Sequence, residues 1–571
     1  MSVLNQLQRG QDLEAMREQT HDILVIGGGV TGAGVALDAA SRGLSTAIVE
    51  AQDWASGTSS RSSRLVHGGL RYLYQLDFKL VAEALHERAL LLTTLAPHLV
   101  QAQPFLWPLK MPIIERTYSA IGVGMYDALA VAGAGGRKSV PIQKHLSRKQ
   151  TKQAFPAIDD HSLVGAIRFF DARVDDARLV ITLVRTAVRF GARAASRTQV
   201  VEMLQEGDRI CGARVRDLET GKEFDVRARH VINATGVWTE KTQNLASSGG
   251  GLKVLASKGS HIVVPRDRIK ADAGMFLRTE KSVLFIIPWQ RYWVIGTTDT
   301  AWHEQLKHPV PTRADIDYIL EHANSVLADP LTHDDIIGTY AGLRPLLQPE
   351  VLDETKSTKV SREHTVAEVA PGMTAIAGGK LTTYRVMAAD AVDFALGDRA
   401  DSLPSVTDRT PLLGADGYQA TLRRAPHLME QYGWDASRTE HLLDRYGSLI
   451  TDLTALIDEQ PEFGEPLETA PDFLKAEVVM ACRDEGALHL EDILYARIRL
   501  NSETRDRGES AVDEIGRIAA EILGWDDARL ETEKRNYLTR IAAERAAELE
   551  STDAAASQAR LEATDIVGDF D

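Results

Sequence analysis

The stretch Ile26-Gly27-Gly28-Gly29-Val30-Thr31-Gly32-Ala33-Gly34 decides the fold. It follows a short apolar strand and opens a helical stretch, and its glycines at 27, 29 and 32 satisfy the G-x-G-x-x-G pattern. Small residues let the backbone turn tightly and let a pyrophosphate approach the N–H groups at the helix N-terminus. Glu50 closes the next apolar strand, about 20 residues on, where it can accept a hydrogen bond from an adenosine ribose hydroxyl. Together these features predict a dinucleotide-binding domain.

Length, charge and cysteine content restrict the class of protein. The chain has 571 residues, of which 44% are hydrophobic and 26% are charged, as in ordinary globular proteins with several domains. Its formal net charge of −16 predicts no nucleic-acid partner and weakens any electrostatic attachment to anionic lipid. The cysteines, Cys211 and Cys482, are far apart and lack metal-ligand spacing. We therefore expect no metal site, no disulfide framework and a reducing compartment.

No segment has the pattern of a signal peptide or a membrane span. Residues 1–20 are polar and charged, which is unlike a secretory signal. The apolar stretch 121–136 is interrupted by Asp127, is rich in Gly and Ala, and is too short to span a bilayer. A membrane-dipping loop is the alternative for this stretch and for the aromatic stretch 105–109. We interpret both as buried chain.

Later glycine motifs favour a flavin over a nicotinamide. A nicotinamide dehydrogenase usually completes its nucleotide domain in one contiguous run, whereas here nucleotide-type elements return at Asn233-Ala234-Thr235-Gly236 and at Gly378-Gly379-Lys380. A discontinuous nucleotide domain with a substrate domain inserted between its pieces suits FAD. The helix opening at 379–383 would direct its N-terminal dipole at the flavin, where negative charge develops on reduction.

The strand and helix patterns predict an α/β + α fold. We expect a discontinuous, Rossmann-like FAD-binding domain of the glutathione-reductase/D-amino-acid-oxidase type, with an inserted antiparallel-sheet substrate domain and a C-terminal helical domain. Strand signals fade after about residue 405, and the last residues are rich in Ala, Glu, Ser and Asp. The expected boundaries are 17–100, 168–248 and 366–400 for the FAD-binding domain, 101–167 and 249–365 for the substrate domain, 405–545 for the helical domain and 546–571 for a flexible tail.

A series of motifs resembles the FAD-dependent, quinone-linked glycerol-3-phosphate dehydrogenases, most closely those of actinobacterial type. The first signature comprises the glycine loop with Ala36, Asp38 and Arg42-Gly43, and the second comprises Gly378-Gly379-Lys380 with Thr383-Tyr384-Arg385. The motifs between and after them are Thr58-Ser59-Ser60-Arg61-Ser62-Ser63, His67-Gly68-Gly69-Leu70-Arg71-Tyr72, Val174-Asp175-Asp176-Ala177-Arg178, Lys258-Gly259-Ser260-His261, Gly296-Thr297-Thr298-Asp299, Gly342-Leu343-Arg344-Pro345 and Arg445-Tyr446-Gly447-Ser448. One departure is Arg64, where the family often has Lys.

The resemblance implies oxidation of sn-glycerol 3-phosphate to dihydroxyacetone phosphate, with hydride transfer from C2 to N5 of FAD. A phosphate monoester requires cations, and Arg suits bidentate phosphate contacts. Removal of the hydroxyl proton requires a base, for which histidine is suited near neutral pH. The resemblance places Arg71, Tyr72, Arg344 and Arg362 at the substrate. It also implies that His261 is the base, that His67 orients flavin or substrate, and that Lys380 lies near both.

The cofactor contacts combine the glycine loop with positions implied by the resemblance. The expected FAD contacts are Gly27, Gly29, Gly32, Glu50, Thr58, Ser59, Ser60, Val200, Gly236, Gly379 and Thr382.

The expected partners are glycerol 3-phosphate, a quinone acceptor and a second copy of the chain. Quinone use implies transient contact with the inner face of the cytoplasmic membrane, whereas the acidic balance and the missing membrane span predict a largely soluble, cytoplasmic protein. One alternative is an oxidase that passes electrons to dioxygen. An amine or amino-acid oxidase of the same fold is disfavoured by the arginines, and a non-catalytic flavin-binding protein is disfavoured by His261, Arg344 and Lys380.

Overall fold

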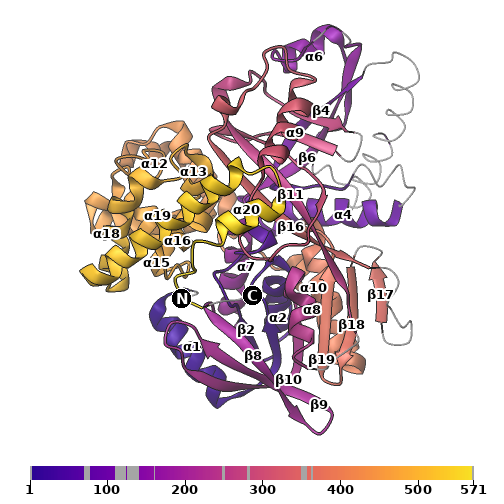
Figure 1. Ribbon diagram of the computed structural model, residues 1–571, viewed down its shortest axis with the longest axis vertical. Helices are drawn as coiled ribbons and strands as arrows, with labels where there is room; N and C mark the ends of the chain where they lie inside the picture. Colours follow the sequence, from indigo (N-terminus) through magenta and orange to yellow (C-terminus); the bar gives the residue numbers. More distant parts are fainter. Residues whose placement is uncertain are drawn as a thin grey trace.

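The computed structural model describes residues 3–69, 78–109, 124, 140–159, 161, 163–246, 251–279, 283–348, 357–361 and 364–568. Two sheets lie one above the other in Figure 1, and a group of C-terminal helices lies beside the region where the sheets meet. Within the described ranges, no helix is both long enough and apolar enough to cross a membrane.

The first sheet gathers strands from distant parts of the chain around β1 (Thr20–Ile26). β1 pairs in parallel with β2 (Thr46–Val49) on one side and with β10 (Glu223–Asn233) on the other, and β10 pairs in parallel with β19 (Met373–Gly378). The remaining strands are β7 (Arg193–Ala195), β8 (Thr198–Glu206), β9 (Arg209–Asp217), β17 (Ser357–Ser361) and β18 (His364–Ala370). Because the carboxyl ends of the parallel strands meet at one edge, that edge collects the loops that can bind a nucleotide.

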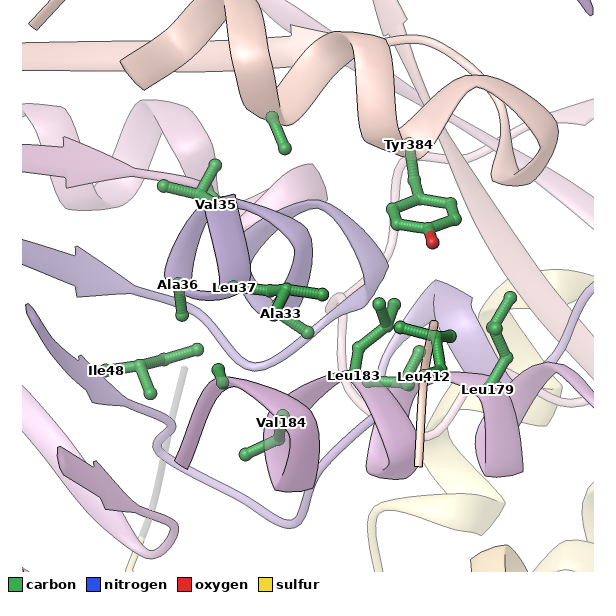
Figure 2. Close-up of a cluster of buried hydrophobic side chains, with 14 of the residues drawn as sticks. Ala33, Val35, Ala36, Leu37, Ile48, Leu179, Leu183, Val184, Tyr384 and Leu412 are labelled. Atoms are coloured by element: carbon green, nitrogen blue, oxygen red, sulfur yellow. The ribbon is translucent and has the colours of Figure 1, made fainter. Parts of the chain in front are cut away.

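Helix α2 (Val30–Ser41) packs between α7 (Asp176–Arg189) and α10 (Tyr384–Leu396), as Figure 2 shows. Its side chains toward these helices are small and apolar, which allows close packing. A Cβ atom on Gly34 would lie 3.0 Å from Cδ2 of Tyr384. At the end of α2, the buried Arg42 pairs with Asp38 at 2.5 Å. These contacts explain why the first signature continues beyond the glycine loop.

The second sheet is mostly antiparallel. Its strands are β3 (Leu65–Val66), β4 (Val100–Leu109), β5 (Lys144–Ser147), β6 (Gly165–Val174), β11 (Val254–Pro265), β12 (Gly274–Arg278), β13 (Val283–Pro288), β14 (Tyr292–Gly296), β15 (Thr300–Ala301) and β16 (Gly338–Leu347). Helix α9 (Arg313–Asn324) packs its apolar side chains on β11 and β14. The expected boundary at residue 168 falls inside β6, and β17 and part of β18 belong to the first sheet although we expected them in the substrate domain.

Smaller helices flank the two sheets. They are α1 (Gln6–Glu18), α4 (Phe78–Leu90), α6 (Arg148–Ala154) and α8 (Thr239–Gln243). Helix α1, which lies mostly before the expected start of the FAD-binding domain, attaches to the first sheet through the buried Asp12. The carboxylate of Asp12 accepts a hydrogen bond from the N–H of Ala194 at 3.1 Å.

The C-terminal helices pack around two apolar clusters of their own. They are α11 (Tyr418–Arg423), α12 (Ala425–Tyr432), α13 (Ala436–Tyr446), α14 (Ile450–Glu459), α15 (Lys475–Arg483), α16 (Leu490–Asp492), α17 (Leu500–Glu503), α18 (Val512–Leu523), α19 (Asp527–Leu549) and α20 (Asp553–Arg560). The segment expected to be a flexible tail therefore contains the end of α19 and all of α20. Arg560 is fully buried, and its guanidinium donates to the carbonyl of Gln305 at 2.8 Å. Polar contacts and a small cluster of Val310, Ala547 and Ala556 hold this segment, and its short alanine side chains gave no strong apolar signal in the sequence.

Buried ion pairs fasten the C-terminal helices to the first sheet and its helices. Arg497 binds both carboxylate oxygens of Asp53, at 2.5 and 2.8 Å. Glu485 accepts two hydrogen bonds from Arg178, at 2.7 and 3.0 Å. All four residues are buried, and removing one member of such a pair leaves an uncompensated charge. The relative placement of these parts is therefore fixed by charge as well as by packing.

A buried histidine at the same boundary provides a pH-dependent contribution to stability. His489 hydrogen-bonds to Glu219 at 2.8 Å and to Glu533 at 2.9 Å. Burial and Arg197 lower the pKa of His489, but the two carboxylates outweigh them and raise the pKa to about 9. Protonated His489 therefore stabilises the folded chain fully below pH 6.5, and this contribution is lost as the pH rises through about 9.

We expect the substitution His489→Gln to remove this pH dependence. Wild-type protein should lose on the order of 3 kcal/mol of stability from this group between about pH 6 and pH 10, whereas the variant should lose much less over that range. Thermal unfolding at several pH values measures the difference. The control is His161→Gln, since the His161 side chain is 93% exposed. Parallel pH profiles for His489→Gln and wild type would contradict the assignment.

Candidate active site

A cavity of about 450 Å³ lies at the carboxyl ends of β1, β2, β10 and β19. Its lining comes from the loop after β1, the end of β2, the start of β8, and the loops after β10 and β19. Of the predicted cofactor contacts, the lining includes Gly27, Gly29, Glu50, Thr58, Ser59, Val200, Gly236 and Gly379. Lys380 lines it as well. The structure thus brings together segments separated by more than half of the sequence.

The glycine loop permits close approach of the backbone at the entrance to α2. A Cβ atom on Gly32 would lie 1.9 Å from the carbonyl oxygen of Gly27, and one on Gly27 would lie 2.7 Å from the carbonyl oxygen of Ala234. Gly27 also has a φ of +109°, a conformation that favours glycine. Gly32 does not itself line the cavity. Its role is to let the first turn of α2 pack against the loop, which places the helix N-terminus at the cavity.

Glu50 lies at the end of β2 with both carboxylate oxygens engaged by the backbone. It accepts hydrogen bonds from the N–H of Gly28 at 2.5 Å and from the N–H of Gln52 at 2.8 Å. Burial and the nearby Asp53 raise the pKa of Glu50, although the two hydrogen bonds oppose them. Each carboxylate oxygen keeps a further lone pair for a ribose hydroxyl.

Two predicted cofactor contacts lie elsewhere. Ser60 does not line the cavity, and its carbonyl oxygen accepts a hydrogen bond from Arg499 of the C-terminal helices. Thr382 is buried outside the lining. Its hydroxyl accepts from the N–H of His67 at 3.0 Å and donates to the carbonyl of His67 at 3.2 Å. Both residues connect parts of the fold around the cavity, which sequence spacing could not reveal.

His261 lies on β11 in the second sheet and is buried. Its Nε2 is 2.9 Å from Oγ of Ser63, and its ring stacks on Tyr340 with centroids 4.7 Å apart. Burial lowers the pKa of His261 well below its usual value, and the positive charges of Arg344 and Arg64 lower it further. The imidazole is therefore neutral near pH 7, as a proton acceptor must be.

Arg344 lies on β16, which pairs with β11. Its guanidinium donates to Oγ1 of Thr297 at 3.0 Å and to the carbonyl of Thr298 at 3.2 Å, and it approaches Asp299 at 3.3 Å. The side chain remains 35% exposed, so part of this cation is accessible to a ligand. His261 and Arg344 thus combine a neutral base with a partly accessible cation.

Two glycines that sequence reasoning did not assign make room for these side chains. A Cβ atom on Gly259 would lie 2.5 Å from Nη2 of Arg344, and one on Gly296 would lie 2.5 Å from Cδ2 of His261. Both stand in the motifs that carried the resemblance. The sequence could have indicated these two glycines only through their proximity to the predicted site residues. That proximity depends on which strands pair, which the sequence does not show.

Lys380 and His67 lie where the two sheets meet. Lys380 follows Gly378 and Gly379, whose φ values are +82° and +83°, and it caps the short helix η7 (Leu381–Thr383). The Nδ1 atom of His67 accepts from the N–H of Gly69 at 3.1 Å. Arg71, Tyr72 and Arg362 fall outside the described residues.

The cavity and the pair formed by His261 and Arg344 share one wall. The hydroxyl of Thr58, which lines the cavity, donates to the carbonyl of Leu343 at 2.5 Å. Pro345, directly after Arg344, also lines the cavity. The arrangement can therefore hold an extended dinucleotide on one side, with a base and a cation for an anionic alcohol nearby.

Comparison with known proteins agrees with this architecture. Residues 22–385 match the family model described as FAD dependent oxidoreductase, and residues 405–530 match that described as C-terminal domain of alpha-glycerophosphate oxidase. These matches confirm the expected fold class: an FAD-binding fold followed by a helical domain.

Relatives and a solved structure identify the branch of this family. The chain is 51% identical over 563 residues to Glycerol-3-phosphate dehydrogenase 2 of Mycobacterium tuberculosis, covering 98% of this chain and 95% of the relative. It is 36% identical to the human mitochondrial glycerol-3-phosphate dehydrogenase, covering 89% of this chain and 71% of that protein. The crystal structure of the glycerol-3-phosphate dehydrogenase from Bacillus halodurans complexed with FAD superimposes with a TM-score of 0.76 at 28% identity, covering 95% of this chain and 98% of that chain. The chain therefore belongs to the family of FAD-dependent glycerol-3-phosphate dehydrogenases.

Proposed function

We propose that FAD binds in the cavity at the carboxyl ends of the first sheet. The close approach of Gly32 to Gly27 supports this placement, because it brings the N-terminus of α2 to where a pyrophosphate would lie. Glu50 would hold the adenosine ribose, and the backbone around Val200 would meet the adenine. Gly379 and Lys380, which follow β19, also line the cavity. When bound, FAD supplies the acceptor for the hydride that leaves the substrate.

The chain oxidises sn-glycerol 3-phosphate to dihydroxyacetone phosphate. The observation that carries this proposal is that His261 and Arg344 lie on the paired strands β11 and β16, with the Arg344 guanidinium against Gly259, two residues before His261. Arg344 binds the phosphate, assisted by Arg71 and Arg362. As the C2–H bond breaks, His261 takes the proton of the C2 hydroxyl, so that the alcohol becomes a ketone.

Three further residues complete the site. Tyr72 donates a hydrogen bond to the substrate. Lys380, at the start of η7, lies where it can reach both substrate and cofactor. His67 orients the flavin or the substrate through the segment that its backbone fastens to Thr382.

The electrons pass to a quinone, and the protein acts as a homodimer that visits the inner face of the cytoplasmic membrane. The resemblance to quinone-linked dehydrogenases supports this part of the proposal. Dioxygen is the second candidate acceptor, because residues 405–530 match a domain named for alpha-glycerophosphate oxidase.

The substitution Gly32→Ala should abolish FAD retention. A methyl group 1.9 Å from the carbonyl oxygen of Gly27 forces α2 away from the loop. The ratio of flavin to protein absorbance after purification measures the effect. Gly10→Ala is the matched control, since no atom lies within 4 Å of its new Cβ. A Gly32→Ala protein with full FAD content would contradict the placement of the cofactor.

Substitutions at His261 and Arg344 should separate proton removal from phosphate binding. In anaerobic flavin reduction by glycerol 3-phosphate, we expect His261→Asn to lower the limiting rate by about 10²- to 10⁴-fold. Arg344→Met should instead raise the half-saturating concentration by about 10- to 100-fold, because a charge-assisted bond to phosphate is lost. Arg313→Met on the surface of α9 is the control.

Two results would overturn these roles. Rapid reduction of His261→Asn would remove His261 as the base. Equal oxidation of glycerol and glycerol 3-phosphate by the wild type would remove the phosphate site.

The rate of flavin reoxidation distinguishes the two acceptors. After anaerobic reduction by glycerol 3-phosphate, the enzyme is mixed with a water-soluble naphthoquinone or with air-saturated buffer. We expect the quinone to reoxidise the flavin faster. Faster reoxidation by air with stoichiometric hydrogen peroxide would instead establish an oxidase.

A further inference from the structure

The two ring nitrogens of His261 have different surroundings. Nε2 lies 2.9 Å from Oγ of Ser63, within hydrogen-bond distance. Nδ1 is buried and has no hydrogen-bond partner in the part of the chain that the structure describes. The ring therefore has one nitrogen within hydrogen-bond distance of Ser63 and one that no described residue engages.

The ring is confined in this orientation. Tyr340 stacks on it at an interplanar angle of 13°, and Gly296 lies against its Cδ2 edge. Tyr340 is itself fixed, since its hydroxyl donates to the carbonyl of Ser62 at 3.0 Å and its ring centroid lies 5.4 Å from the guanidinium carbon of Arg64. A flip of the His261 ring would place a carbon atom where Nε2 now contacts Ser63.

The charges around His261 leave one proton on the ring. Burial disfavours the imidazolium most, and the positive charges of Arg344 on β16 and of Arg64, directly after Ser63, disfavour it further. A neutral imidazole has one N–H group and one lone pair. Which nitrogen has the lone pair decides which one can accept a proton.

We propose that Ser63 is a positioning residue that fixes the tautomer of His261, its hydroxyl accepting the Nε2–H bond so that the lone pair stays on the buried Nδ1. This inference rests on the proposed function, in which His261 is the base. The C2 hydroxyl proton then passes to Nδ1, while the Nε2 proton remains on Nε2 throughout. The imidazolium so formed keeps its bond to Ser63, now charge-assisted, and the Nδ1 proton returns to water after the ketone leaves.

The kinetic test compares Ser63→Ala with Ser63→Thr in the FAD-loaded enzyme. In anaerobic reduction by glycerol 3-phosphate, Ser63→Ala should lower the limiting rate by about 10- to 100-fold, because the reactive tautomer is no longer enforced. The half-saturating concentration should stay near the wild-type value, since Arg344 is unchanged. Ser63→Thr retains the hydroxyl and should restore the rate. FAD content and thermal midpoint should remain those of the control Ser325→Ala, whose side chain is exposed.

A spectroscopic test reads the tautomer directly, without turnover. In holoenzyme with ¹⁵N-labelled histidine, the His261 signals are assigned by their loss in His261→Asn. Wild type and Ser63→Thr should show a protonated Nε2 and an unprotonated Nδ1, and Ser63→Ala should show both tautomers.

The possible results separate this inference from the proposed function. Protonated Nδ1 in the wild type, or a Ser63→Ala rate equal to that of Ser325→Ala, would overturn the role of Ser63. Equal losses in Ser63→Ala and Ser63→Thr would also overturn it, because they indicate a steric role. Failure of the wild type to be reduced by glycerol 3-phosphate would overturn the proposed function, and the nitrogen spectra would still show whether Ser63 fixes the tautomer.

Discussion

The contact between Gly32 and the carbonyl of Gly27 is the constraint on which the site depends. Because residue 32 has no side chain, α2 starts directly against the end of β1. Ala234, the residue after β10, also lies close to this point. The helix is then held between α7 and α10. Helix α10 follows Gly379 and Lys380 in the sequence. Its packing on α2 therefore places these two residues at the same cavity as the glycine loop after β1.

The site also shows how an acidic protein handles an anionic ligand. The chain has a formal net charge of −16, yet the groups acting on His261 are two arginines. Arg64 is buried among aromatic rings and bonds to the hydroxyl of Tyr292 at 2.6 Å, whereas Arg344 stays partly exposed. One cation therefore belongs to the protein interior and the other can face a ligand. Burial first, and then these two nearby cations, lower the pKa of His261, whatever the overall charge of the chain.

The sequence predicted the elements whose signal is local. Gly27, Glu50 and the alternation of strand and helix follow from backbone geometry, and in the structure both residues line one cavity. His261 and Arg344 followed from the resemblance, while the pairing of their strands, β11 and β16, is known only from the fold. Ser60, Thr382 and the helix α20 could not be placed, because their positions depend on partners far along the chain. Short polar residues and an alanine-rich segment have no periodic pattern that reveals such partners.

The ion pairs between the C-terminal helices and the first sheet also bear on how the chain folds during synthesis. Asp53 and Arg178 emerge early from the ribosome, whereas Arg497 and Glu485 are made only when most of the chain is complete. Until then, each early residue has a charge without the partner that it has in the finished molecule. Burying either charge without its partner would leave it uncompensated, so the contact between the first sheet and the C-terminal helices is completed only after residues 485 and 497 have been made.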